Sequence, residues 1–450
     1  MRNLIVVLSA ARNGWLVFAV LAALLLCATL AWHFPLMFWD HLDLAPIYAG
    51  WQDGTLARTG FLRIHGGHLH TAAYVVLLLT TRLSHGQTWL DCVVSWTLLI
   101  CYAGIVFAIA RRTLPMENLS GRLTVVLIVF LLLYPGHLAN LQWGWQVAVF
   151  LCLFGSAVAI ACFTAERLTW VGNLTALAAT GIALLSFATG LALVPIALIA
   201  LTARSELRMR DRLSFLIPWL LVCAAAVWAA SSTAHVLAHF STESIALAWA
   251  KLKLWTVVLY TLNYLGAGIG RFIPTAAPWL AVVALASGLA AICALRRRRS
   301  AWPWAAFFLF GVGSAVLTAL ARFSEGDAQA FAARYVSFSS LFWIGWIALC
   351  FLWAEVGRSR IAARVPILFG IIAMLAAANA LQMTQESAKL GAETRVLAQT
   401  ICVAYPQIDE SVLSGMYYGG PEAALEHLHI LRRFGFAPFD DCNSPKKDPD

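Results

Sequence analysis

Long apolar runs separated by clusters of arginine make up most of this chain. One run ends at Leu295, four arginines follow at Arg296–Arg299, and the next run begins at Ala301. About 20 apolar residues cross a bilayer as a helix, and a lipid environment leaves only helices and closed barrels as spanning forms. The alternating pattern of a membrane barrel is absent. The sequence therefore predicts a helical bundle that crosses a membrane several times.

Composition supports the same fold class. Of the 450 residues, 61% are hydrophobic and only 12% are charged, with a mean hydropathy of +0.78. A chain this apolar cannot hide its surface in one water-soluble core. We expect an all-α, polytopic transmembrane bundle of about eleven spans. The expected spans are 14–34, 88–110, 122–135, 146–164, 169–186, 189–203, 213–231, 277–295, 302–320, 336–354 and 365–382.

The arginine clusters predict the orientation. They lie between alternate spans, and arginine and lysine concentrate in cytoplasmic loops. The net charge of +9 is then mostly a topology signal, so no nucleic-acid partner is expected. We expect a bacterial inner-membrane protein with a cytoplasmic N-terminus, an uncleaved first span and a C-terminus outside. The clusters are Arg2 and Arg12; Arg111, Arg112 and Arg122; Arg167; Arg204, Arg208, Arg210 and Arg212; Arg296 to Arg299; Arg358, Arg360 and Arg364.

Most of the unusual polar residues then fall outside the cytoplasm. The short inner loops leave no room for a cytoplasmic catalytic domain, and no Walker or G-x-G-x-x-G motif is present. Any chemistry is expected in the outer loops and the tail. The outer loops are 35–87, about 136–145, 187–189, 232–276 and 321–335.

The first outer loop carries two aspartates, Asp40 and Asp43, just beyond a span. Carboxylates three residues apart on a helix can share a proton or a divalent cation. An aspartate at the membrane surface can also act as a general base that takes the proton from an attacking hydroxyl. The alternative is that both carboxylates simply solvate the loop.

Three histidines, His65, His68 and His70, follow in the same loop. Imidazoles can bind zinc, but this spacing lacks the H-E-x-x-H pattern of a zinc site. They can also donate to a phosphate or pyrophosphate leaving group, or remain interfacial polar residues. The apolar stretch Thr71–Leu83 is too short to span, so we expect a helix at or dipping into the membrane surface.

A second polar element runs from Asn140 to Gln146. Gln142 and Gln146 can hydrogen-bond sugar hydroxyls, and Trp143 or Trp145 can stack on a sugar face. The competing interpretation is an ordinary aromatic belt at the membrane interface.

The last outer loop contains Arg322, Glu325, Asp327 and Arg334, the last followed by Tyr335. An arginine here can clamp a lipid-linked phosphate, because its planar fork matches phosphate oxygens. Alternatively, the charges form salt bridges within the loop. Upstream, the apolar stretch 254–265 is too short for a span, and we expect a surface or re-entrant helix there.

The tail, 383–450, is richer in Glu, Lys, Asp and Pro than the membrane domain 1–382. We expect a small extracytoplasmic appendage with a short helix at 421–433. On that side of the membrane Cys402 and Cys442 can form a disulfide.

The order of these motifs resembles bacterial GT-C glycosyltransferase-like membrane proteins. The similarity rests on the acidic first outer loop, the His-x-x-His cluster before a short apolar helix, the Asn140–Gln146 element and the Arg334-Tyr335 pair. The resemblance implies a catalytic aspartate in the first outer loop, Asp40 or Asp43, and a polyprenyl-phosphate sugar as donor. Related proteins often read His-Asn-Glu-His-Arg where this chain has His65–Leu69.

Three functions follow as hypotheses. The first is a glycosyltransferase that moves a sugar from a polyprenyl-phosphate donor to an envelope glycan, lipid or protein. The second is a transporter or flippase of a lipid-linked glycan, and the third is a non-catalytic glycan-binding protein. The lipid bilayer is the expected solvent, no tightly held cofactor is implied, and the sequence leaves the sugar, the acceptor and the oligomeric state open.

Overall fold

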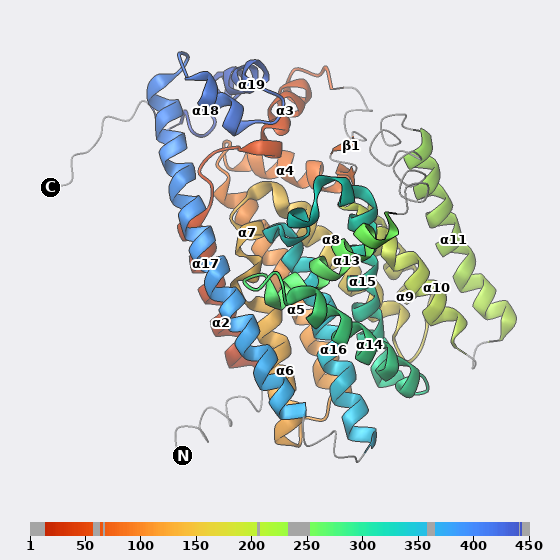
Figure 1. The fold of residues 1–450 in the computed structure, drawn as a ribbon. Coiled ribbons are helices and arrows are strands. Elements are labelled where there is room, and N and C mark those ends of the chain that lie inside the picture. The colour runs from red at the N-terminus through yellow and green to blue at the C-terminus, as the bar shows by residue number, and fades with distance from the viewer. Residues whose placement is uncertain are drawn as a thin grey trace.

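A computed structural model describes residues 14–56, 64–65, 68–204, 208–232, 253–357, 365–440 and 442. It is a helical bundle with one two-residue strand pair (Figure 1). The first half contains α2 Trp15–Trp32, η1 Trp39–Asp43, α3 Leu44–Gln52, β1 Ile64–His65, β2 His68–Leu69, α4 Thr71–Leu83, α5 Trp89–Thr113, α6 Leu119–Leu133, η3 Pro135–His137, α7 Leu138–Leu141, η4 Gly144–Gln146, α8 Val147–Phe163, α9 Trp170–Leu184, η5 Ala188–Ala192, α10 Leu193–Thr202 and α11 Met209–Ser232.

The second half begins after a stretch that lies outside the described residues. It ends in two short helices, α18 and α19, that follow the longest helix of the chain, α17. The elements are α13 Leu254–Gly270, α14 Ala277–Leu295, η6 Arg299–Ala301, α15 Trp302–Arg322, η7 Phe323–Glu325, η8 Asp327–Phe331, η9 Ala333–Tyr335, α16 Val336–Gly357, α17 Val365–Ala404, α18 Glu410–Met416 and α19 Pro421–Phe434.

Eight helices of the described residues are long and apolar enough to cross a membrane, which confirms the polytopic class. They are α2, α5, α6 continued through α7, α8, α14, α15, α16 and α17. The described residues therefore do not confirm the expected count of about eleven. Two expected spans, 169–186 and 189–203, correspond to helices α9 and α10 of only 15 and 10 residues, because the chain turns between them. A third expected span, 213–231, lies in the 24-residue helix α11. This helix is not among the eight, and residues outside the described part of the chain follow it.

The arginine clusters gather at one end of the bundle, as their alternation predicted. Arg111 and Arg298 line the same cavity. Arg204 and Arg299, from two other clusters, both donate to the backbone carbonyl of Glu166, at 3.4 and 2.9 Å. Arg204 is buried and also donates to the Phe163 carbonyl at 3.1 Å, so it caps the free carbonyls at the end of α8. The clusters Arg2 with Arg12, and Arg358 with Arg360 and Arg364, lie outside the described residues.

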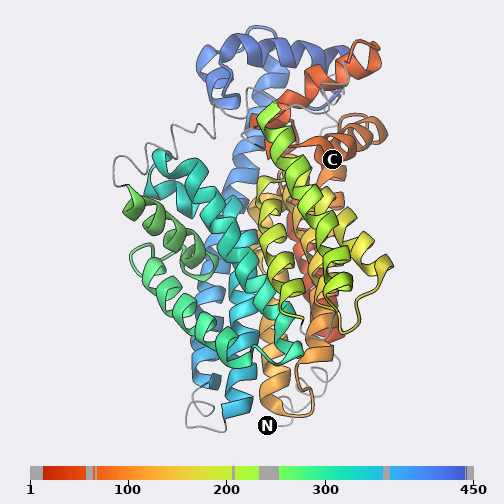
Figure 2. The same cartoon turned by 90° about the vertical axis from the view of Figure 1, so that its right-hand side faces the viewer.

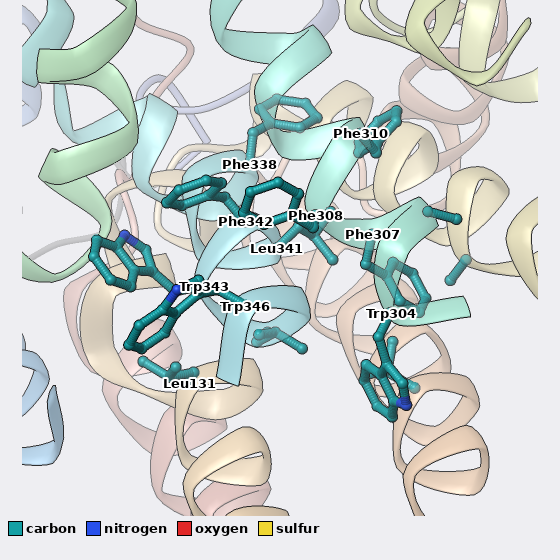
Figure 3. Packing of buried hydrophobic residues seen from close by; sticks show 14 of the residues in the cluster. Leu131, Trp304, Phe307, Phe308, Phe310, Phe338, Leu341, Phe342, Trp343 and Trp346 are labelled. Atoms are coloured by element: carbon teal, nitrogen blue, oxygen red, sulfur yellow. The ribbon is translucent and has the colours of Figure 1, made fainter. Parts of the chain in front are cut away.

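Helix α16 is the central element of the bundle, with nearly its whole span buried. It packs against α15 through aromatic side chains, with the rings of Phe308 and Phe342 stacked 4.8 Å apart (Figure 3). Gly345 permits this approach, because a Cβ there would come within 2.5 Å of the Phe308 backbone nitrogen. The two helix backbones are therefore in close contact, and any side chain at Gly345 would force them apart.

Helix α17 carries the chain from the bundle into the tail without interruption. At 40 residues it is about 60 Å long, roughly twice the hydrocarbon thickness of a bilayer. The expected boundary at 382/383 therefore falls inside a helix. Figure 1 shows α17 ending beside α18, α19 and α3 at one end of the molecule. Cys402 and Cys442 form the expected disulfide, and the expected helix at 421–433 is α19.

The tail and the first outer loop share one apolar cluster. Leu428 and Phe436 of the tail pack with Tyr48 of α3 in this cluster, and Figure 2 shows the tail helices lying across the same end of the bundle as α3. Hydrogen bonds also connect the tail to this loop. Asp43, which is buried, accepts hydrogen bonds from the hydroxyls of Tyr417 and Tyr418, the latter at 2.6 Å. The tail therefore packs on this loop and covers it.

This arrangement predicts that Tyr417→Phe lowers the stability of the protein. The substitution removes one donor to a buried carboxylate, which costs about 1–3 kcal/mol. Thermal unfolding of the purified protein in detergent measures the effect. The control is Tyr405→Phe, whose hydroxyl meets the exposed His429. If both variants lose the same thermal stability, or if Tyr417→Phe loses none, the hydrogen bond from Tyr417 to Asp43 does not stabilise the protein.

Candidate functional site

A small cavity lies at the end of the bundle opposite the arginine clusters. Its walls come from four of the expected outer loops and from the adjoining helix ends, which the fold brings together across almost 300 residues of sequence. Its volume is about 60 Å³, room for a few water molecules. The lining residues are Asp40, His70, Trp145, Gln146, Phe187, Ala188, Thr189, Leu191, Leu317, Thr318, Ala321, Arg322, Arg334 and Tyr335.

Asp40 reaches the cavity from the short helix η1. The residue before it, Trp39, has a positive φ of 52°, a conformation that is unfavourable for a bulky side chain and needs support from its surroundings. Trp143 provides that support, because its indole nitrogen donates to the Phe38 carbonyl at 3.1 Å and its ring packs edge-on against Trp39 at 5.4 Å. The half-buried Asp40 is therefore held in place by a strained turn that tryptophan rings fix.

The turn η4 supplies the adjacent wall. Gly144 starts this turn, and a Cβ at Gly144 would lie 2.7 Å from the Cβ of Asp91 and 3.0 Å from the His41 ring. Only glycine lets η4 lie this close to both residues. The two residues that follow, Trp145 and Gln146, line the cavity. η4 thus connects the cavity to a buried polar pair beneath it.

That pair is His41 and Asp91, both almost fully buried. The His41 Nε2 and the Asp91 Oδ2 are 3.7 Å apart, and Thr80 of α4 donates a hydrogen bond to the other oxygen of Asp91. Burial lowers the pKa of His41 to about 3, because an apolar environment disfavours the charged imidazolium. His41 is therefore neutral at physiological pH. Its ring lies between η1, which carries Asp40, and the start of α5.

His70 closes the same side of the cavity. Its ring stacks on Trp145 at a centroid distance of 5.2 Å, and it directly precedes α4. Two residues after His70, the backbone amide of Ala72 donates to the Leu185 carbonyl at 2.9 Å. Helix α4 has the bounds expected from the sequence, Thr71–Leu83.

Two arginines form the far wall. Arg322 pairs with Glu325 at 2.7 Å, so the loop salt bridge expected as an alternative does form at this position. The Arg334 guanidinium packs over the Tyr335 ring at 5.2 Å and makes no ion pair within the described part of the chain. Asn140 donates to the Arg334 backbone carbonyl at 2.9 Å. A carboxylate and two guanidinium groups thus line one cavity, which can accept a proton and bind an anion.

The other sequence-predicted residues lie elsewhere. Asp43 faces the tail tyrosines, as described above. Gln142 and Trp143 are buried outside the cavity, and Trp143 acts as a support for η1. His65 and His68 pair across the antiparallel strands β1 and β2, where only the backbone is described. Within the described residues, no group of three or more His, Cys, Asp or Glu side chains is placed to hold a metal ion.

Two hydroxyl residues of the cavity wall, Thr189 and Thr318, were not predicted from the sequence. Thr189 lies in η5, and Thr318 lies one turn before the end of α15, where its hydroxyl donates to the Ser314 carbonyl. Threonine is common in membrane helices, so the residue type alone does not indicate a binding site. For Thr189, its position in the three-residue outer loop 187–189 was the one feature of the sequence that placed it near the other outer-loop candidates.

The burial of His41 predicts a pH-dependent stability. The pKa is about 3 in the folded protein and 6.5 ordinarily, so between these values the unfolded chain binds a proton that the folded chain excludes. The contribution of His41 to stability is therefore full above pH 6.5 and falls as the pH drops, by at most about 1.4 kcal/mol per pH unit.

Thermal unfolding in detergent from pH 7 to pH 4 measures this slope. In His41→Gln the slope should become shallower, whereas His429→Gln, at an exposed tail histidine, should leave it unchanged. The same slope in His41→Gln as in the unsubstituted protein would show that His41 does not titrate in this way.

Comparisons with protein-family models, curated proteins and solved structures find no match to this chain.

Proposed function

We propose that the chain is an integral-membrane glycosyltransferase that uses a polyprenyl-phosphate sugar at the extracytoplasmic face. The observation that carries this proposal is the cavity at the end of the bundle away from the arginine clusters, lined by Asp40 together with Arg322 and Arg334. If positive-inside bias holds, this end lies outside the cytoplasm. A donor anchored by its lipid would present its phosphate at this depth.

The reaction assigns one role to each side of the cavity. An acceptor hydroxyl attacks the anomeric carbon of the donor sugar, and the bond from that carbon to the phosphate oxygen breaks. Asp40 takes the hydroxyl proton as general base. The polyprenyl phosphate leaves with the bonding electron pair, and Arg334 stabilises its charge through bidentate hydrogen bonds. Gln146 and Trp145 contact the sugar.

Of the two aspartates proposed from the sequence, Asp40 is the better candidate for the base. It lines the cavity, whereas Asp43 is buried outside the cavity and hydrogen-bonds the tail tyrosines.

Substrate binding requires one wall of the cavity to move. A volume of about 60 Å³ is smaller than a sugar with its phosphate. The segment between α15 and α16 is the best candidate for this motion, since it consists of three short 3-10 helices and turns at Gly326, whose φ is 94°. Loops with such short elements are common lids in enzymes.

The transporter alternative receives less support. A transporter needs a polar path through the bundle. Among the described residues, the interior between α15 and α16 is filled by aromatic rings, including Phe308, Phe342 and Trp343 (Figure 3). Moving a glycan through this region would require these helices to separate.

The proposal predicts that Asp40→Asn abolishes sugar addition without loss of protein. A deletion strain complemented with each variant at matched membrane abundance is compared by mass spectrometry of envelope glycans and glycolipids. Unsubstituted protein should restore a sugar addition, and Asp40→Asn should lower it by at least about 100-fold, as expected for loss of a general base.

Glu426→Gln is the matched control, because Glu426 is an exposed tail carboxylate outside the cavity. It should restore the profile fully. Restoration by Asp40→Asn as well would show that the cavity carboxylate is not the base, and transport or glycan binding would then be the better hypothesis.

A further inference from the structure

A second, larger cavity lies at the opposite end of the bundle, where the arginine clusters gather. Its volume is about 480 Å³, and polar surface dominates its walls. It lies between the end of α5, the segment that leads to α6, the start of α15 and the end of α16. The lining residues are Arg111, Arg112, Thr113, Leu114, Pro115, Met116, Glu117, Arg298, Ser300, Leu352 and Glu355.

The charges of this cavity match a single negative charge. Three arginines and two glutamates line it, which leaves one positive charge in excess (3 − 2 = 1). Neither Arg112 nor Arg298 forms an ion pair with another described residue, and both are exposed. Arginine forks bind phosphate oxygens well. A phosphodiester with one negative charge would balance the cavity.

An apolar groove follows this cavity closely along the chain. It lies between α2, α6 and α17, has a volume of about 540 Å³, and is lined almost only by apolar surface. Glu117 lines the basic cavity and Ser120 lines the groove. Three residues of chain span at most about 11 Å, so a charged head in the cavity and a hydrocarbon chain in the groove can belong to one molecule.

We propose that these two cavities form one binding site for an anionic phospholipid of the arginine-rich leaflet. The phosphodiester lies between Arg112 and Arg298, and one acyl chain lies along Leu123, Leu127 and Phe369. Basic pockets between membrane helices commonly take such head groups. This site is separate from the cavity of the proposed reaction. Its occupant would hold α6 against α17 and α16.

Binding is measured by native mass spectrometry of the detergent-purified protein, titrated with phosphatidylglycerol or with phosphatidylcholine of the same chains. The unsubstituted protein should retain phosphatidylglycerol at least about 10-fold better. R112Q/R298Q should lose most of this preference, since each arginine near a lipid phosphate contributes roughly five-fold in affinity. R112K/R298K, which keeps the charge, should retain part of it.

Two further variants test the position of each half of the site. R296Q/R297Q removes the same charge from the same end but outside the cavity, and should bind as the unsubstituted protein does. Gly370 lines the groove, and a Cβ there would meet no atom within 4 Å. G370L should therefore fold normally yet fill the groove and weaken retention of both lipids.

Three results would overturn the proposal. Equal losses in R112Q/R298Q and R296Q/R297Q would mean that the arginines attract lipid only as a diffuse surface charge. Unchanged retention in G370L would mean that the groove holds no acyl chain of the bound lipid. Competition by inorganic phosphate at the same concentration as the lipid would indicate a site for a free anion.

Discussion

The fold depends on one property of lipid, which is that it cannot hydrogen-bond a backbone amide or carbonyl. Every crossing segment must therefore be a helix, and the arginine-rich cavity and the cavity that Asp40 lines lie at opposite ends of the bundle. Irregular structure survives there because neighbouring protein satisfies it. The turn that carries Asp40 illustrates this, since the Phe38 carbonyl accepts from Trp143 and the Phe34 amide donates to the Gln142 carbonyl at 2.9 Å.

The two aspartates of the first outer loop have different surroundings. Asp43 is buried and binds the tail through Tyr417 and Tyr418, whereas Asp40 remains half-buried at the cavity. One carboxylate therefore binds the tail, and the other lines the cavity. The tail contributes to the site indirectly, because the loop it covers is the loop that presents Asp40.

Much of this organisation could be predicted from the sequence. Apolar runs gave eight of the expected spans, and alternating arginine clusters indicated which loops share an end. The candidate residues Asp40, Gln146, Arg322, Arg334 and Tyr335, which are far apart in sequence, do line one cavity.

Other features depend on tertiary contacts that local patterns do not encode. Apolar composition cannot show that α9 and α10 are too short to span, because the turn between them follows from packing. The spacing of Asp40 and Asp43 did not reveal their different partners, since those partners are nearly 400 residues away for Asp43. The buried His41 beside Asp91 had no visible pattern either, because the two residues come from different elements and meet only in the folded chain, next to Gly144.

The proposed function requires that the cavity at the end away from the arginine clusters binds a polyprenyl phosphate. The most direct measurement is photo-crosslinking of the purified protein with a polyprenyl-phosphate analogue that carries a diazirine beside the phosphate, followed by peptide mapping. We expect adducts on segments 187–191 and 317–335, and fewer of them in Arg334→Gln. Adducts confined to the arginine-rich end, or adducts unaffected by Arg334→Gln, would contradict binding of the polyprenyl phosphate in this cavity.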